Sequence, residues 1–262
     1  MTAETPQAPA RRNGALIAVL IVIAALVLLA VGAAVIATVV RSQVHTDQTV
    51  EIGDRLEVDI PTAELTFVAS DRDDVRIEVD GAYLFGAPEV TTTTSNGLTR
   101  MTGGCPTIPF SICSVEVTVE LPADLDLDIV GTNGRISIDG VTGAIDVITT
   151  NGGIDVSGAE GDLALSTTNG SVTVTDASST DVVGATTNGA VSLSFATAPD
   201  RVEARTTNGS VAITLPDDDE PYAIDAQTTN GSVDLVRVTN DPDADRSISA
   251  HSVNGSVEIV AE

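Results

Sequence analysis

The chain has 262 residues and a formal net charge of −26, with 38 acidic residues against 12 basic ones. This balance argues against binding to nucleic acid through a basic surface, because phosphate backbones are contacted by clustered Lys and Arg. Aromatic residues make up only 2% of the chain, so the stacking platforms that bind single-stranded nucleic acids are scarce as well.

Residues 14–40 form an apolar run without a single charged side chain. A helix of this length spans roughly 40 Å, which exceeds the hydrocarbon core of a bilayer, about 30 Å thick. A cleavable signal peptide is the alternative. Its apolar region is usually shorter, about 7–15 residues, and ends at a small-x-small cleavage site. The run is longer than that and no clean site follows it, so we predict an uncleaved transmembrane signal anchor.

The charges on either side of this run predict how it is oriented. Arg11 and Arg12 precede it, whereas the chain after Arg41 is acidic. The positive-inside rule therefore predicts a cytoplasmic tail at residues 1–13, the anchor at 14–40 in contact with the lipid bilayer, a juxtamembrane linker at 41–49 and an extracytoplasmic domain at 50–262. The expected location is the plasma membrane, crossed once.

Residues 50–121 alternate between apolar and polar side chains, as in LEVDI, VRIEV and VEVTVEL. A period of two indicates half-buried strands, and we expect these to be the opening coils of the domain that follows. Cys105 and Cys113 interrupt the pattern. Outside the cytoplasm a disulfide between them is expected, with free thiols or a metal site as the alternatives.

From Gly131 onward one phrase recurs seven times, as in TTNGSVTV and TTNGSVAI. Its asparagines are Asn133, Asn151, Asn169, Asn188, Asn208, Asn230 and Asn254. A weaker eighth copy begins at Asn96. Each repeat holds two short alternating runs, such as Ile136/Ile138 and Ile145/Val147, and turn residues separate the two runs.

Two architectures fit this repeat. Asn-Gly between strands is a strong hairpin signal, which would give an antiparallel meander. In a β-solenoid, by contrast, each repeat is one coil and equivalent residues stack about 4.8 Å apart, where like side chains form ladders. Only stacking rewards near-identity of the repeats. We therefore predict an all-β, right-handed β-solenoid, similar to a single-stranded β-helix, with the seven asparagines as a structural corner ladder.

Three more specific functions compete with this structural interpretation of the repeats. Asp217, Asp218, Asp219 and Glu220 could be catalytic carboxylates, but an acidic run is usually a solvated loop. Asp241, Asp243 and Asp245 alternate as in calcium loops, yet Arg246 and Ser252 stand where an EF-hand needs Gly and Glu. Outward threonine rows can bind a repeating polymer, although the position of TTN at a turn favours a structural role. We expect no catalytic residue, no cofactor and no metal site.

The TTNGSV and TNGxIxI phrases, the opening LEVDIPTAELTFVASDRDDVRIEV and the preceding apolar run resemble the putative adhesin family, over about residues 50–262. These are bacterial domains of β-strand repeats, often behind a membrane segment. The resemblance implies a cell-envelope location and suggests adhesion, but its motif is structural and carries no catalytic residue.

The sequence thus predicts a non-catalytic cell-surface or envelope module with an adhesin-like binding role, whose partner is an unknown surface polymer or envelope protein. The alternative is a sensory or regulatory module for envelope stress. That role would require a membrane partner, because a tail of residues 1–13 is too small to hold a signalling domain. The sequence makes no prediction of the oligomeric state.

Overall fold

The computed structural model describes residues 14–39, 42–106 and 112–262. The chain divides into two units between Ser42 and Gln43, and each is considered by itself. The predicted cytoplasmic tail, with Arg11 and Arg12, lies outside the described residues.

The first unit is the helix α1 (Gly14–Val39), which covers the predicted anchor. Its side chains are described for residues 18–32, and large apolar ones such as Leu28 and Leu29 are exposed. No helix among the described residues reaches the length and hydropathy of a membrane span.

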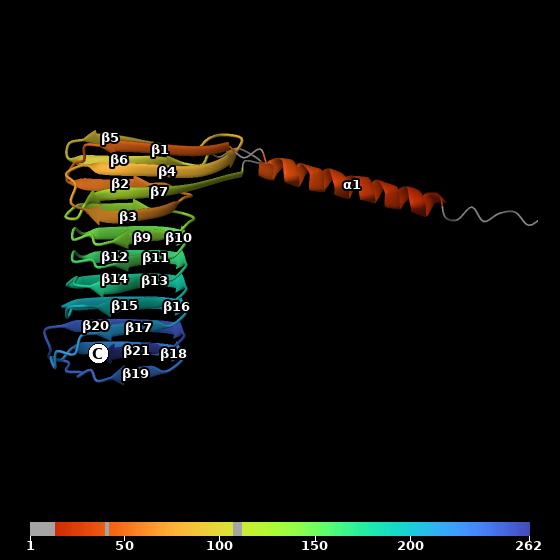
Figure 1. Cartoon of the computed structure of the whole chain (residues 1–262). Coiled ribbons are helices and arrows are strands. Elements are labelled where there is room, and N and C mark those ends of the chain that lie inside the picture. The colour runs from red at the N-terminus through yellow and green to blue at the C-terminus, as the bar shows by residue number, and fades with distance from the viewer. Residues whose placement is uncertain (1–13, 40–41, 107–111) are drawn as a thin grey trace, which may run out of the picture. The chain divides into compact units, whose positions relative to one another are not determined.

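The second unit is built from strands that form two sheets (Figure 1). The strands are β1 (Ser42–Val50), β2 (Arg55–Asp59), β3 (Glu64–Ser70), β4 (Val75–Leu84), β5 (Glu89–Ser95), β6 (Leu98–Gly104), β7 (Ile112–Pro122), β8 (Asp126–Val130), β9 (Ile136–Asp139), β10 (Ile145–Asn151), β11 (Ile154–Ser157), β12 (Leu163–Asn169), β13 (Val172–Ala177), β14 (Asp181–Asn188), β15 (Val191–Phe195), β16 (Arg201–Asn208), β17 (Val211–Leu215), β18 (Ala223–Asn230), β19 (Val233–Val236), β20 (Ser247–Asn254) and β21 (Val257–Ala261). Sheet A has the order β1-β4-β7-β3-β9-β11-β13-β15-β17-β21-β19, and sheet B has the order β18-β20-β16-β14-β12-β10-β8-β2-β6-β5.

Each repeat is one coil that adds one strand to sheet B, turns at Asn-Gly and adds the next strand to sheet A. Neighbouring coils pair in parallel with equivalent residues in register, so that Asn151 lies opposite Asn169 and Ile154 lies opposite Val172. The β-solenoid prediction is therefore confirmed, and the antiparallel meander is wrong for the repeats. The right-handed turn of the coil stays a prediction.

The core lies between the two sheets and is made of the inward residue of every alternating pair. Val172, Val191 and Val211 are fully buried, one from each of three successive coils. The narrow space between the sheets accepts Val, Ile, Leu and Ala. This explains why the repeats contain few aromatic side chains.

The order of the coils departs from the order of the chain at the C-terminal end of the stack. The last coil, β20–β21, lies between β16–β17 and β18–β19. The connection at residues 216–222 must therefore pass over one coil position, a span of roughly 10 Å for two strand spacings, and the connection at 237–246 steps back by one coil, roughly 5 Å. The longer period of the last repeats follows from these two crossings.

The N-terminal end of the stack shows the same exchange. The coil β2–β3 lies between β6–β7 and β8–β9, because β2 pairs with both β6 and β8. Residues 50–121 thus form the opening part of the stack as expected, but their strands do not follow one another in chain order. Asn96 and Gly97 both have positive φ and join β5 to β6 in an antiparallel hairpin, so Asn96 does not begin an eighth repeat.

The two ends of the stack are finished differently. Antiparallel pairs, β4 with β7 and β5 with β6, close the N-terminal end. At the other end the core positions Val233 and Leu235 of β19 are 40% and 41% exposed, whereas Val211 and Ile213 of an inner coil are 0% and 1% exposed. The stack is thus uncapped at β18–β19 within the described residues.

The Asn-Gly corner brings the backbones of successive coils close together. A Cβ atom added at Gly152 would lie 1.8 Å from the carbonyl oxygen of Gly134, and one added at Gly170 would lie 2.0 Å from that of Gly152. Such contacts are far inside van der Waals distance. Glycine is therefore required here because the neighbouring coil leaves no space for a side chain.

We predict that Gly152→Ala lowers the free energy of unfolding by about 3 kcal/mol, because two backbones must move apart. The next residue provides a matched control. A Cβ atom added at Gly153 would meet nothing closer than 3.6 Å, so Gly153→Ala should stay within about 1 kcal/mol of the wild type. Thermal and denaturant unfolding of both variants measures this. Equal stability of the two variants would contradict the close-approach argument.

Candidate functional site

The asparagine side chains of the corner form a continuous hydrogen-bonded ladder. Asn151 donates to Asn133 over 3.1 Å, and each later asparagine donates from Nδ2 to the Oδ1 of the coil before it in the stack over 2.9 Å. The spatial order is Asn133, Asn151, Asn169, Asn188, Asn208, Asn254 and Asn230. The exchange of the last two coils leaves the ladder unbroken, because both repeats carry the same corner.

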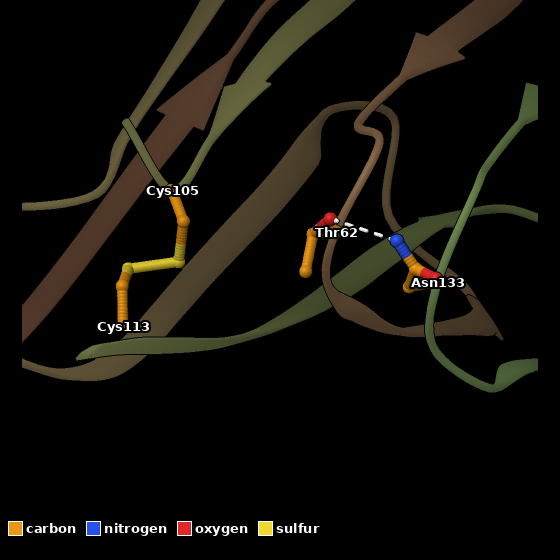
Figure 2. The surroundings of a disulfide bond; sticks show 4 residues. All are labelled: Thr62, Cys105, Cys113 and Asn133. Atoms are coloured by element: carbon orange, nitrogen blue, oxygen red, sulfur yellow. Dashed lines mark hydrogen bonds between the residues drawn. A yellow bond between two sulfur atoms is a disulfide. The ribbon is translucent and has the colours of Figure 1, made fainter. Parts of the chain in front are cut away.

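The ladder ends on the coil β2–β3, where Thr62 takes the place of the asparagine. The Nδ2 of Asn133 donates to the Oγ1 of Thr62 over 3.4 Å (Figure 2). Thr62 and Asn133 also form a parallel β-bridge. This corner reads Pro-Thr-Ala, without the Asn-Gly phrase, so sequence reasoning missed it. The only signal was that this short loop also separates two alternating runs.

The first threonine of each TTN phrase faces inward. Thr149, Thr167, Thr186 and Thr206 are nearly buried. The hydroxyl of Thr167 donates to the carbonyl oxygen of Gly152 over 2.9 Å, and Thr186 and Thr206 make the same bond to the coil before them. Thr149, at the first full repeat, is buried without a hydrogen-bond partner among the described residues. Thr167, Thr186 and Thr206 therefore tie their strand ends to the adjacent corner.

The second threonine of each phrase points outward on sheet B, beside the ladder. We call the set Thr150, Thr168, Thr187, Thr207 and Thr229 the threonine row; all five are exposed. Their hydroxyls make no hydrogen bond to any described residue. Val253 takes this position in the coil β20–β21, so the row runs without interruption from Thr150 to Thr207.

A shallow acidic groove of about 340 Å³ lies on the outer face of sheet B, some residues before the threonine row on the same strands. Arg55 contacts Asp128 over 3.0 Å and Asp126 over 3.5 Å at one end of it. Asp146 is paired in register with Asp128. Partial desolvation of its carboxylate, and next the charge of Asp128, raise the pKa of Asp146.

Two of the candidate carboxylates in the two crossing connections make local contacts, Asp218 with Arg246 and Asp241 with the backbone N–H of Asp243. Arg246 pairs with Asp218 over 2.6 Å, and this hydrogen bond lowers the pKa of the Asp218 carboxyl. The guanidinium of Arg246 also lies 4.3 Å from the ring centre of the buried Tyr222, and burial raises the pKa of Tyr222 to about 12. Asp241, Asp243 and Asp245 do not belong to any group of three possible metal ligands among the described residues.

Cys105 and Cys113 form a disulfide at the junction of β6 and β7, with their Cα atoms 5.8 Å apart (Figure 2). The bond closes the segment that contains residues 107–111, which lie outside the described residues. Its position beside the N-terminal cap places it away from the threonine row, which begins at Thr150. The disulfide therefore links the end of β6 to β7.

The domain is thus a stack of two-sheet coils with a repeated Asn-Gly corner. A family model described as Toastrack DUF4097 matches residues 40–261. The chain belongs to the Toastrack DUF4097 family. This match confirms the family resemblance that the TTNGSV phrase indicated.

Solved structures similar to this Toastrack chain have low sequence identity. A putative cell adhesion protein from Clostridium sporogenes is 12% identical with a TM-score of 0.42, covering 84% of this chain and 100% of its own. A putative adhesin from Bacteroides fragilis is 11% identical with a TM-score of 0.45, covering 84% and 98%. A putative lipid binding protein from Parabacteroides distasonis is 12% identical with a TM-score of 0.40, covering 82% and 96%. No curated protein matches the chain.

The raised pKa of Asp146 has a consequence for the stability of this Toastrack domain. We predict that Asp146→Asn raises the free energy of unfolding at pH 7 by about 0.5 kcal/mol, because like charges in register destabilise a sheet. The folded state disfavours the ionised carboxylate of Asp146, so this carboxylate destabilises the fold fully only above its raised pKa. The destabilisation disappears below the ordinary aspartate pKa, about 3.9, where the group is protonated in both states. The gain should therefore shrink as the pH falls.

Denaturant unfolding of the wild type and Asp146→Asn between pH 3 and pH 7 measures this difference. Asp139→Asn is the matched control, since it removes one charge from the outer face of sheet A where the in-register residues, Val68 and Ser157, are uncharged. A gain that is independent of pH, or equal in the control, would show that the Asp146–Asp128 pair is not its source.

Proposed function

We propose that the chain is a membrane-anchored, non-catalytic module of the cell surface or envelope, and that it binds a repeating polar polymer through the threonine row and the asparagine ladder beside it. The role is adhesin-like. The proposal is carried by one observation: exposed threonines recur in five coils, four of them consecutive, and none makes a hydrogen bond to a described residue.

One position of the repeated phrase has no side-chain hydrogen bond to a described residue in any of its copies, namely the second threonine. The first threonine is buried and bonded, the asparagine builds the ladder, and the glycine permits the close approach of coils. The second threonine recurs just as often, yet its side chain faces solvent. Threonine suits a strand in general, but many other residues do so equally well at an exposed position. A binding surface accounts for its recurrence.

The spacing and charge of this surface indicate the kind of partner. Side chains of successive coils repeat at the strand spacing, about 4.8 Å, on a rigid backbone. Threonine hydroxyls can donate and accept hydrogen bonds, and ordering a short side chain costs little entropy. A chain with a net charge of −26 repels anionic polymers. An uncharged polymer with regularly spaced polar groups, such as a neutral polysaccharide, therefore fits best.

The membrane anchor is part of the proposal. Its support is the uncharged run at residues 14–40, together with Arg11 and Arg12 before it and the acidic chain after it. In this arrangement the protein crosses the plasma membrane once, with residues 1–13 in the cytoplasm and the β-solenoid, whose first strand is β1, outside. Fractionation and protease protection of intact cells test this placement.

We predict that replacing Thr168 and Thr187 by Arg reduces the retention of cells on the bound polymer at least tenfold, equivalent to about 1.4 kcal/mol or more. Two long charged side chains would cover the middle of the threonine row. The measurement is retention of cells that express the full chain on an array of neutral and anionic polysaccharides, with the gene deletion as baseline.

The matched control is the double variant Ser166→Arg and Ala185→Arg, two residues earlier on the same strands β12 and β14 and on the same outer face. It changes the charge equally and should retain binding. Equal loss in both double variants would place the binding surface elsewhere. If deletion changes retention on no surface while another membrane protein co-precipitates with the chain, the regulatory role replaces adhesion.

A further inference from the structure

The strands β1 and β4, neighbours at the N-terminal end of sheet A, bring together one histidine and two carboxylates. The Nδ1 of His45 lies 2.9 Å from an oxygen of Asp80 and 3.8 Å from an oxygen of Glu78. One ligand atom from each of the three residues lies within 4.8 Å of the other two. Glu78 and Asp80 are two residues apart on one strand, so they share a face with His45.

These separations are close to those of a tetrahedral zinc site. With bonds of about 2.05 Å, ligand atoms of such a site lie roughly 3.3 Å apart. A histidine nitrogen with two carboxylate oxygens is a ligand set for zinc, whereas calcium and magnesium prefer oxygen alone. Small side-chain rotations would bring the three atoms to equal distances, because all three residues are at least partly exposed.

The charges around the cluster are compatible with a bound cation. Among the described residues, Arg76 is the arginine that contacts the cluster, and it is bound mainly to Asp47 over 2.8 Å and to Glu120 over 3.2 Å. Its distance to Glu78 is 3.6 Å. Asp47 is thereby held outside the ligand set, while Glu78 and Asp80 face a histidine. A divalent ion would neutralise both carboxylates.

We propose that His45, Glu78 and Asp80 bind one zinc ion, with the fourth position open to water or to a ligand from outside the chain. The ion would link β1, the first strand after the helix unit, to β4 of the N-terminal cap. This site is separate from the threonine row, and it does not depend on the proposed adhesion.

The second histidine supplies an internal control. His251 contacts Asp225 over 3.1 Å on sheet B, much as His45 contacts Asp80. No third ligand group joins this pair among the described residues. A simple histidine–aspartate pair is thus present twice in the described part of the chain, but the three-ligand arrangement is found only at His45.

The experiment is titration of the metal-free full chain in detergent with zinc chloride, followed by competition against a chromogenic zinc chelator in excess magnesium. We expect one zinc per chain. His45→Gln and Glu78→Gln should each weaken binding at least about tenfold, since even residues that only support ligands contribute 10–100-fold. His251→Gln should bind as the wild type does. Circular dichroism melting of each variant checks that the fold is intact.

Two results would overturn the site. Wild-type chain that takes up no more zinc than His45→Gln shows that the cluster is only a hydrogen-bonded surface group. Equal weakening by His251→Gln shows that the metal binds non-specifically to the acidic surface. Retention of cells on polymers is measured separately, so failure of the zinc site and failure of adhesion are distinguishable.

Discussion

Close stacking of coils at the Asn-Gly corner is the constraint on which the rest of the structure depends. The backbone of each corner lies directly against that of the next, so that a single Cβ atom at Gly152 would overlap a carbonyl oxygen. This approach brings the asparagine amides within hydrogen-bonding distance and places the first threonine over the neighbouring carbonyl. The corner in turn sets the register of both sheets and the alternation of buried and exposed side chains.

Because the repeats offer nearly the same surface to their neighbours, their coils are interchangeable in the stack. The exchange of the last two coils uses this property. Asn254 lies between Asn208 and Asn230 in the stack and is hydrogen-bonded to both. A terminal coil held between two others has partners on both sides, and we expect this to limit fraying of the last segment of the chain. The cost is two longer connections, at residues 216–222 and 237–246.

The surfaces that we propose as binding sites consist of side chains that the stack leaves exposed. A fold that repeats one corner also repeats the outward position beside it, so the coil sets the spacing of the threonine row, although it does not require threonine there. The proposed zinc ligands differ from this row, since His45, Glu78 and Asp80 belong to the irregular cap and not to the repeats. Regular coils thus supply extended, multivalent surfaces, while chemically specific clusters arise where the repetition stops.

Much of the repeat region could be read from the sequence by itself. Alternation placed Val172 and Val174 inside, near-identity of the phrases indicated stacking, and the two cysteines left one intramolecular pairing. The same dipeptide misled at Asn96, because Asn-Gly suits a hairpin and a coil corner equally. Only the tertiary structure decided the order of coils at the two ends, the use of Thr62 as the last rung, and the meeting of His45 with Glu78 and Asp80. The physical reason is that local patterns specify which face of a strand is buried, whereas equivalent coil surfaces and long connections leave the choice of neighbour to packing of the whole chain.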